Sequence, residues 1–82
     1  ALDYRGMARA LALAGDALLS QGRTADAAVL FLRAGRSALL QGDSGTGKAL
    51  LDRADQLARQ SGANGVSGEI ARVRSAANAG GK

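Results

Sequence analysis

Apolar residues recur at helical spacing in four segments of the chain, and glycines or hydroxyl residues stand between the segments. In the first segment they lie at i, i+4, i+7 and i+11, which is one face of an α-helix. Asp3 is a suitable N-cap before this segment, and Gly22 is a suitable residue to end it. The pattern predicts a helix from Asp3 or Tyr4 to Gln21, with a stripe made of Met7, Leu11, Ala14 and Leu18 that is widened by Ala8, Gly15 and Leu19.

The second segment predicts a helix that follows Thr24 as its N-cap and ends at Gly42. Asp26 lies in its first turn, where a negative charge is favourable near the positive end of the helix dipole. We expect the first two helices to form a hairpin in which Gly15 faces the second helix. The predicted apolar face of that helix comprises Ala27, Ala28, Phe31, Leu32, Gly35, Ala38 and Leu39.

Residues 42–47 form the main predicted break, and a third helix capped by Ser44 or Thr46 is expected to follow as far as Gln60. A second loop, residues 61–66, precedes a short fourth helix capped by Ser67. The predicted fold class is all-α, with four helices arranged as two antiparallel hairpins. The predicted inward residues of these two helices are Leu50, Leu51, Ala54, Leu57 and Ala58, followed by Ile70, Val73 and Ala77.

The length of 82 residues allows one domain, which we place at residues 1–78 with a disordered tail at 79–82. Aromatic residues are nearly absent and there is no proline, so abundant Ala and Leu favour helices over a sheet. No apolar run reaches the ~18–20 residues of a membrane helix. We therefore expect a soluble protein, in the cytoplasm rather than periplasmic or exported. The composition suits a GC-rich bacterial genome.

The chain is basic, with 11 Lys and Arg against 7 Asp and Glu and a net charge of +4. A positive balance is compatible with an acidic partner such as nucleic acid or anionic lipid. The basic residues are scattered, however, at roughly one per helical turn, and form no run. Such placement is typical of solvated helix faces, so a nucleic-acid-binding domain remains an alternative rather than the main prediction.

The segment from Gly42 to Lys48 resembles the phosphate-binding loop G-x-x-x-x-G-K-[ST]. Ala49 replaces the hydroxyl residue that would bind Mg²⁺, and no strand is predicted before the segment. The dipeptide Asp43-Ser44 also resembles the phosphopantetheine attachment site of acyl carrier proteins, but Gly45 replaces the apolar residue expected next. We interpret this segment as a helix–helix linker.

No catalytic constellation is found in the sequence. The chain has no Cys and no His, which removes a thiol nucleophile, the commonest general base and the commonest metal ligands. The carboxylates of Asp52 and Asp55 share a helix face, but Arg53 and Arg59 flank them, which indicates an exposed ion-pair surface. We predict a protein that is not an enzyme, with no cofactor and no metal site.

The sequence contains one internal repeat: residues 14–22, AGDALLSQG, are similar to residues 34–42, AGRSALLQG.

The region from Ala8 to Gln41 resembles a tetratricopeptide repeat, a helix-turn-helix unit of about 34 residues with the pattern W-x₂-L-G-x₂-Y, A-x₃-F and P. Gly15 matches the glycine of W-x₂-L-G-x₂-Y, and Ala27 and Phe31 match A-x₃-F. The remaining pattern positions are occupied by Leu11, Ala14, Leu18 and Leu39.

The resemblance implies a protein-interaction scaffold whose first helices line a groove, with the third and fourth helices as a degenerate second hairpin. We therefore predict that a peptide or partner protein binds there. The second alternative is a self-associating bundle whose groove is a homo-oligomer interface. The residues implied for the groove are Arg9, Ala12, Asp16 and Leu19 from the first helix and Lys48, Leu51, Asp55 and Ala58 from the third.

Overall fold

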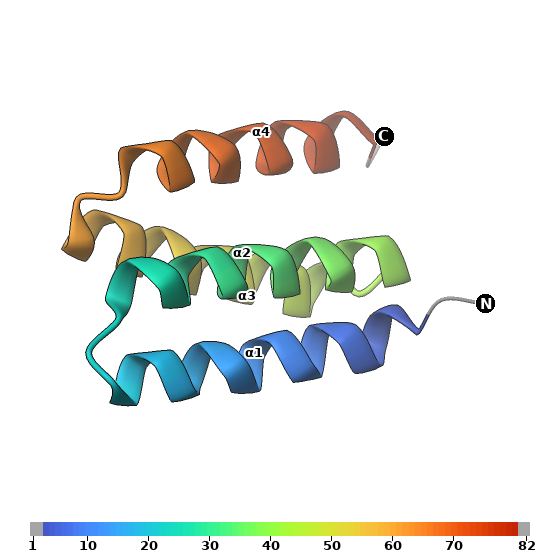
Figure 1. Ribbon diagram of the computed structural model, residues 1–82. Coiled ribbons are helices and arrows are strands. Elements are labelled where there is room, and N and C mark those ends of the chain that lie inside the picture. Colours follow the sequence, from blue (N-terminus) through green and yellow to red (C-terminus); the bar gives the residue numbers. More distant parts are fainter. Residues whose placement is uncertain (1–2, 81–82) are drawn as a thin grey trace.

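The chain folds into four α-helices packed in sequence order as a small helical bundle (Figure 1). A computed structural model describes residues 3–80, and the side chains of residues 3–78. The helices are α1 (Tyr4–Ser20), α2 (Thr24–Gln41), α3 (Ser44–Ser61) and α4 (Asn64–Gly80). Neighbouring helices are antiparallel, so the predicted all-α fold with helical hairpins is confirmed. None of the described helices is long and apolar enough to span a membrane.

Three similar glycine turns connect the helices. Gly22, Gly42 and Gly62 have φ angles of 77°, 94° and 71°, a left-handed conformation that suits glycine. At each turn the next residue donates its backbone N–H to a carbonyl five residues earlier, as Arg23 does to Leu18, which closes a Schellman motif. Each helix therefore ends sharply, and the following one starts at once.

The predictions of long loops at residues 42–47 and 61–66 are therefore wrong. Residues 44–47 belong to α3, which begins at Ser44, and residues 64–66 belong to α4. Their Gly and Ser content is typical of loops, but the Schellman turn and the packing of the helices that follow outweigh this local preference. α4 is 17 residues long rather than short, and it includes residues 79–80 of the predicted tail. Residues 81–82 of that tail lie outside the described residues.

The helix starts agree only in part with the predictions. Asp3 caps α1, as expected, because its carboxylate accepts a 2.9 Å hydrogen bond from the Gly6 N–H. α3 is capped by Asp43 rather than by a hydroxyl residue, since the Asp43 carboxylate accepts from the Thr46 N–H at 3.1 Å. At α2 the N-cap is Arg23, one residue before the expected Thr24, and it makes no side-chain cap hydrogen bond.

Glycines allow the first three helices to approach one another closely. A Cβ atom on Gly15 would lie 2.8 Å from Cε2 of Phe31, so Gly15 of α1 faces α2 as predicted. A Cβ on Gly47 would lie 2.7 Å from Cδ2 of Leu39 and 3.3 Å from the Gly35 carbonyl oxygen. Gly35 and Gly47 therefore form the crossing of α2 and α3, which would not accommodate larger residues at this separation.

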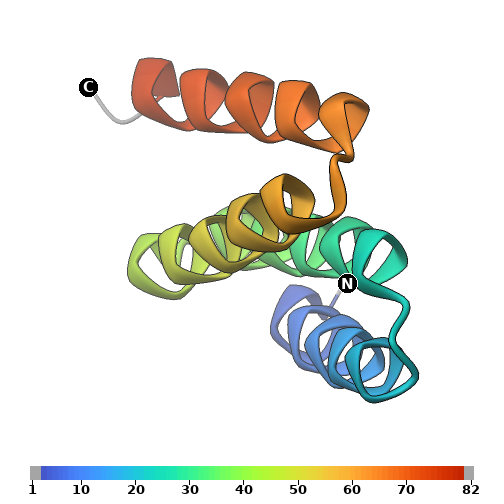
Figure 2. The ribbon, with the colours of Figure 1, turned by 90° about the vertical axis from the view of Figure 1, so that its left-hand side faces the viewer.

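α2 lies at the centre of the bundle and contacts the other three helices. Seen from the end, α1 lies on one side of α2, α3 lies beside it, and α4 covers the opposite side (Figure 2). α4 packs less extensively than the others, chiefly through Ile70, which is completely buried. The core is made mainly of residues from α2 and α3: Ala27, Ala28, Phe31, Leu32, Leu51, Ala54, Leu57 and Ala58.

α1 presents only part of the predicted stripe to this core. Ala8 and Gly15, which widen the stripe, are buried, and Leu18 and Leu19 are half-buried and pack against the core. Met7 and Ala14 are exposed, and Leu11 is half-buried. Small side chains face α2 because the helix axes are close, and this leaves the larger apolar residues at the edge of the contact.

Candidate functional site

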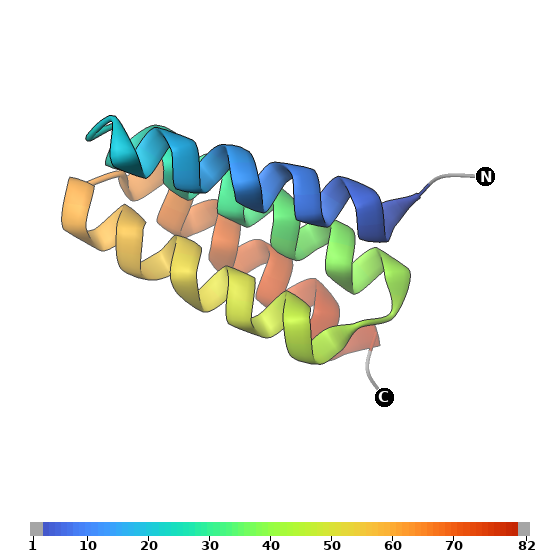
Figure 3. The ribbon, with the colours of Figure 1, turned by 90° about the horizontal axis from the view of Figure 1, so that it is seen from below.

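An open groove of about 430 Å³ lies between α1 and α3, with the end of α2 as its floor. Viewed from below, α1 and α3 lie toward the reader and α2 lies behind them (Figure 3). We call this hollow the α1–α3 groove. Its lining residues are Arg5, Ala8, Arg9 and Ala12 from α1, Ala38 and Gln41 from α2, Asp43 from the turn, and Thr46 and Leu50 from α3.

The α1 wall includes two of the residues implied by the resemblance. Arg5, Arg9 and Ala12 are at i, i+4 and i+7, so one face of α1 carries all three into the groove. Asp16 is exposed on the same helix but does not line the groove. Leu19 is half-buried and packs against the hydrophobic core. Thus Arg9 and Ala12 lie where they were expected, and Asp16 and Leu19 lie outside the hollow.

The α3 wall is formed by other residues than those expected. Leu51 and Ala58 are each only 1% exposed and belong to the hydrophobic core, where a partner would not contact them. Lys48 is exposed but lies beside Leu51 in a hollow between α3 and α4. The expected residues therefore point toward α2 and α4, and the side of α3 that faces α1 presents Thr46 and Leu50.

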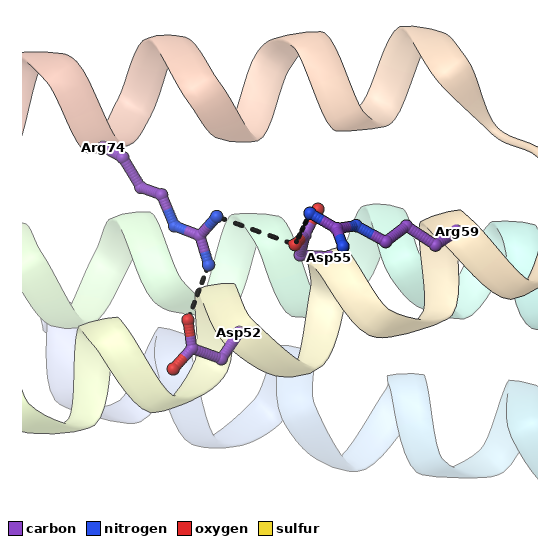
Figure 4. A network of polar contacts seen from close by, with 4 residues as sticks. All are labelled: Asp52, Asp55, Arg59 and Arg74. Atoms are coloured by element: carbon purple, nitrogen blue, oxygen red, sulfur yellow. Dashed lines mark hydrogen bonds and ion pairs between the residues drawn. The ribbon is translucent and has the colours of Figure 1, made fainter.

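Asp55, the remaining expected residue, belongs to an ion-pair network between α3 and α4 (Figure 4). Its carboxylate lies 3.2 Å from a guanidinium nitrogen of Arg59 and 3.7 Å from one of Arg74. Arg74 also pairs with Asp52 at 2.5 Å. Only 18% of the Asp55 side chain is exposed, so these contacts hold it against α4 rather than in the groove.

The groove is positive toward the start of α1. Arg5 and Arg9 are exposed, and within residues 3–78 neither has an ion-pair partner. The acid in the lining is Asp43, which caps α3. Hydrogen bonds from the side chain and the backbone of Thr46 lower the pKa of Asp43, and the charge of Arg5 lowers it further. Asp43 is thus held by Thr46 and forms no ion pair with Arg5 or Arg9 within residues 3–78.

The segment that resembles a phosphate-binding loop is not a loop. Ser44, Thr46 and Lys48 lie in α3, and Gly47 is buried at the crossing with α2. Its backbone groups form a helix, so they do not surround an anion as such a loop does. Among residues 3–80 no group of three or more His, Cys, Asp or Glu residues is placed to hold a metal ion.

Sequence reasoning missed Thr46 because it placed residues 42–47 in a loop, and it assigned Leu50 to the inward face of the third helix rather than to the groove. Had α3 been started at Asp43, helical spacing would have placed Thr46 and Leu50 on one face, four residues apart. Arg5 was visible in the same way, four residues before Arg9. The adjacent pair Leu50 and Leu51 is ambiguous from sequence alone, since either could face the core.

The comparisons with known proteins do not identify a relative. No known protein family matches the sequence, and no match is found among curated proteins or among solved structures. The chain is therefore described by its architecture alone: it is a four-helix all-α domain in which adjacent antiparallel helices pack together.

Proposed function

We propose that this chain is a non-catalytic protein-interaction domain, built like tetratricopeptide-type helical hairpins, that binds a peptide or partner protein in the α1–α3 groove. The observation that supports the proposal is the composition of this groove. Ala12 and Leu50 supply apolar surface, Thr46 and Gln41 supply polar groups, and arginines border it. Sites for peptides and small ligands commonly combine apolar surface with a few placed polar groups in this way.

Peptides selected from a random library displayed on phage provide a probe for this proposal. We expect enriched peptides to bind the domain and to shift the amide resonances of Arg9, Ala12 and Leu50. The double variant Arg5→Glu/Arg9→Glu should weaken their binding by about tenfold or more, because partner groups lose two favourable charges.

The matched control is Arg33→Glu/Arg36→Glu, which makes the same change of charge on the other side of the bundle. This control should leave unchanged the affinity of those selected peptides that shift the resonances of Arg9, Ala12 and Leu50. Failure to enrich any peptide, or equal weakening by both double variants, would contradict binding in the α1–α3 groove. Salt-dependent binding of duplex DNA by the wild type alone would favour the nucleic-acid alternative instead.

A further inference from the structure

A second groove, of about 380 Å³, lies between α1 and α2 on the side away from the α1–α3 groove. Figure 1 looks onto this side, with α2 in front of α3. Large apolar side chains line it and remain open to solvent: Met7 is 44% exposed and Leu40 is 64% exposed. We define the outer groove by Tyr4, Met7, Leu11, Arg33, Arg36 and Leu40.

The apolar side of the outer groove is long enough to contact about two turns of a helix. Tyr4, Met7 and Leu11 are spaced at i, i+3 and i+7, so they extend for about 10 Å along α1 at a rise of 1.5 Å per residue. Leu40 lies opposite them on α2. A strip of this kind accommodates two turns of a partner helix whose own apolar residues are at i, i+3 or i+4, and i+7.

The polar side of the outer groove carries two positive charges. Arg33 and Arg36 are three residues apart on α2, so both side chains emerge on the same face. Neither has an ion-pair partner within residues 3–78, and no acidic residue of that range lines the outer groove. Glu69 of α4 accepts a 2.6 Å hydrogen bond from Arg72, which lowers the pKa of Glu69, and the charge of Arg36 lowers that pKa further. Glu69 is therefore paired with Arg72 rather than with Arg36.

We propose that the outer groove binds an acidic amphipathic helix of a partner protein. The apolar face of that helix would cover Met7, Leu11 and Leu40. Two carboxylates spaced at i, i+3 or i, i+4 along the same helix would pair with Arg33 and Arg36. This surface is separate from the α1–α3 groove, so the inference does not depend on the function proposed for that groove.

The charges favour this occupant over two others. A second copy of the chain docked through the same surface would bring two more arginines and no carboxylate to the outer groove, which is unfavourable. An anionic membrane is typically bound by clusters of about four to eight basic residues, and the outer groove contains two. An acidic helix satisfies both the apolar strip and the arginine pair.

The test uses a synthetic helical peptide with Leu at i, i+3 and i+7 and Glu on both flanks of that stripe. Its control is the same peptide with every Glu replaced by Lys. We expect the Glu peptide to bind with an affinity that falls as salt rises, and to shift the amide resonances of Met7, Leu11 and Leu40. The Lys peptide should not bind.

Variants locate the binding. Arg33→Glu/Arg36→Glu should weaken the Glu peptide by about tenfold or more, whereas Arg5→Glu/Arg9→Glu, with the same net charge, should weaken it by less than about threefold. Leu40→Gln should also abolish the resonance shifts, and it tests the site even if the arginine double variant does not fold. Circular dichroism and the unfolding midpoint establish which variants are folded.

Four results would overturn the proposal. The first is equal weakening by the two double variants, which indicates attraction by net charge alone. The second is equal binding of the Lys peptide. The third is binding of phosphatidylserine-containing vesicles that depends on Leu40 while the Glu peptide fails to bind. The fourth is wild-type self-association, seen by sedimentation, that Leu40→Gln removes.

Discussion

The two faces of α1 differ in the size of their side chains and in what covers them. One face carries Ala8 and Gly15, which are buried against α2, with Ala12, Leu18 and Leu19 beside them at the core. The other face carries Met7, Leu11 and Ala14, which are exposed or half-buried. The face with Ala8 and Gly15 is therefore the one that holds the helix in place.

This difference shows that close approach, rather than side-chain size, decides which face of a short helix is packed here. Gly15 lets Phe31 of α2 lie against the backbone of α1, and Gly35 and Gly47 bring α2 and α3 together in the same manner. Such contacts gain dispersion energy along the whole crossing. The larger apolar residues Met7 and Leu40 remain exposed and line the outer groove.

The largest expected loss of stability comes from truncating a core leucine, and an exposed leucine of the same chain serves as the control. Leu51 is 1% exposed and Leu13 is 62% exposed. Leu51→Ala should reduce the free energy of unfolding by about 2–5 kcal/mol, because it removes buried surface and leaves a cavity. Leu13→Ala should change it by less than about 0.5 kcal/mol. Urea denaturation of both variants measures the difference, and similar losses would show that the exposed leucines also hold the fold together.

The next effect compares neighbouring positions on the two faces of α1. Gly15→Leu should reduce the free energy of unfolding by about 1–3 kcal/mol, because the new side chain collides with Phe31. Ala14→Leu adds the same side chain to the exposed face and should be neutral within about 0.5 kcal/mol. If thermal or urea unfolding ranked these two variants the other way, the assignment of the packed face would be incorrect.

The sequence was sufficient for the four helices, the cap at Asp3, the left-handed Gly22 and the contact of Gly15 with α2. Each of these depends on local geometry or on the contacts within one hairpin, which the residue pattern indicates directly. The stripe predicted on α1 included Ala8 and Gly15, but the part of it that packs against α2 was not predictable in this way. Apolar size favours Met7 and Leu11, and only the actual separation of the helices shows that Ala8 and Gly15 are the buried residues.

The candidate site was predictable in part on α1, where Arg9 and Ala12 line the groove but Asp16 and Leu19 do not, and it was not predictable on α3. Arg9 and Ala12 follow from the hairpin register, which Gly15 and Phe31 define. On α3 the register depends on where the helix begins and on which of Leu50 and Leu51 faces α2. Both depend on the crossing at Gly47, a residue that the sequence pattern assigned to a loop.

A smaller effect is expected from the polar contacts of α4. Arg74→Ala removes the pair with Asp52, whose side chain is 74% exposed, and the longer pair with Asp55 at 3.7 Å. We expect a loss of about 0.2–1 kcal/mol in the free energy of unfolding, which high salt should reduce further. The control is Arg72→Ala, which removes only the pair with Glu69 inside α4. A loss as large as that of Leu51→Ala would mean that ion pairs rather than Ile70 hold α4 to the bundle.

The smallest effect concerns the pH dependence contributed by Asp43. Its pKa is lower in the folded state because Thr46 donates hydrogen bonds to the ionised form. Its contribution to stability is therefore complete above the unfolded value, about 3.9, and is lost as the pH falls through the lower folded value. Asp43→Asn keeps a cap without this titration, so its melting temperature should fall less between neutral and acidic pH than that of the wild type. Equal falls would exclude this role for the Asp43 cap.

The stability of the double variant Met7→Gln/Leu40→Gln tests most directly whether the small-residue contacts, rather than the exposed apolar residues, carry the fold. If they do, its free energy of unfolding in urea denaturation should lie within about 0.5 kcal/mol of the wild-type value. A loss of about 2 kcal/mol or more, the size expected for core residues, would show instead that Met7 and Leu40 hold the fold together.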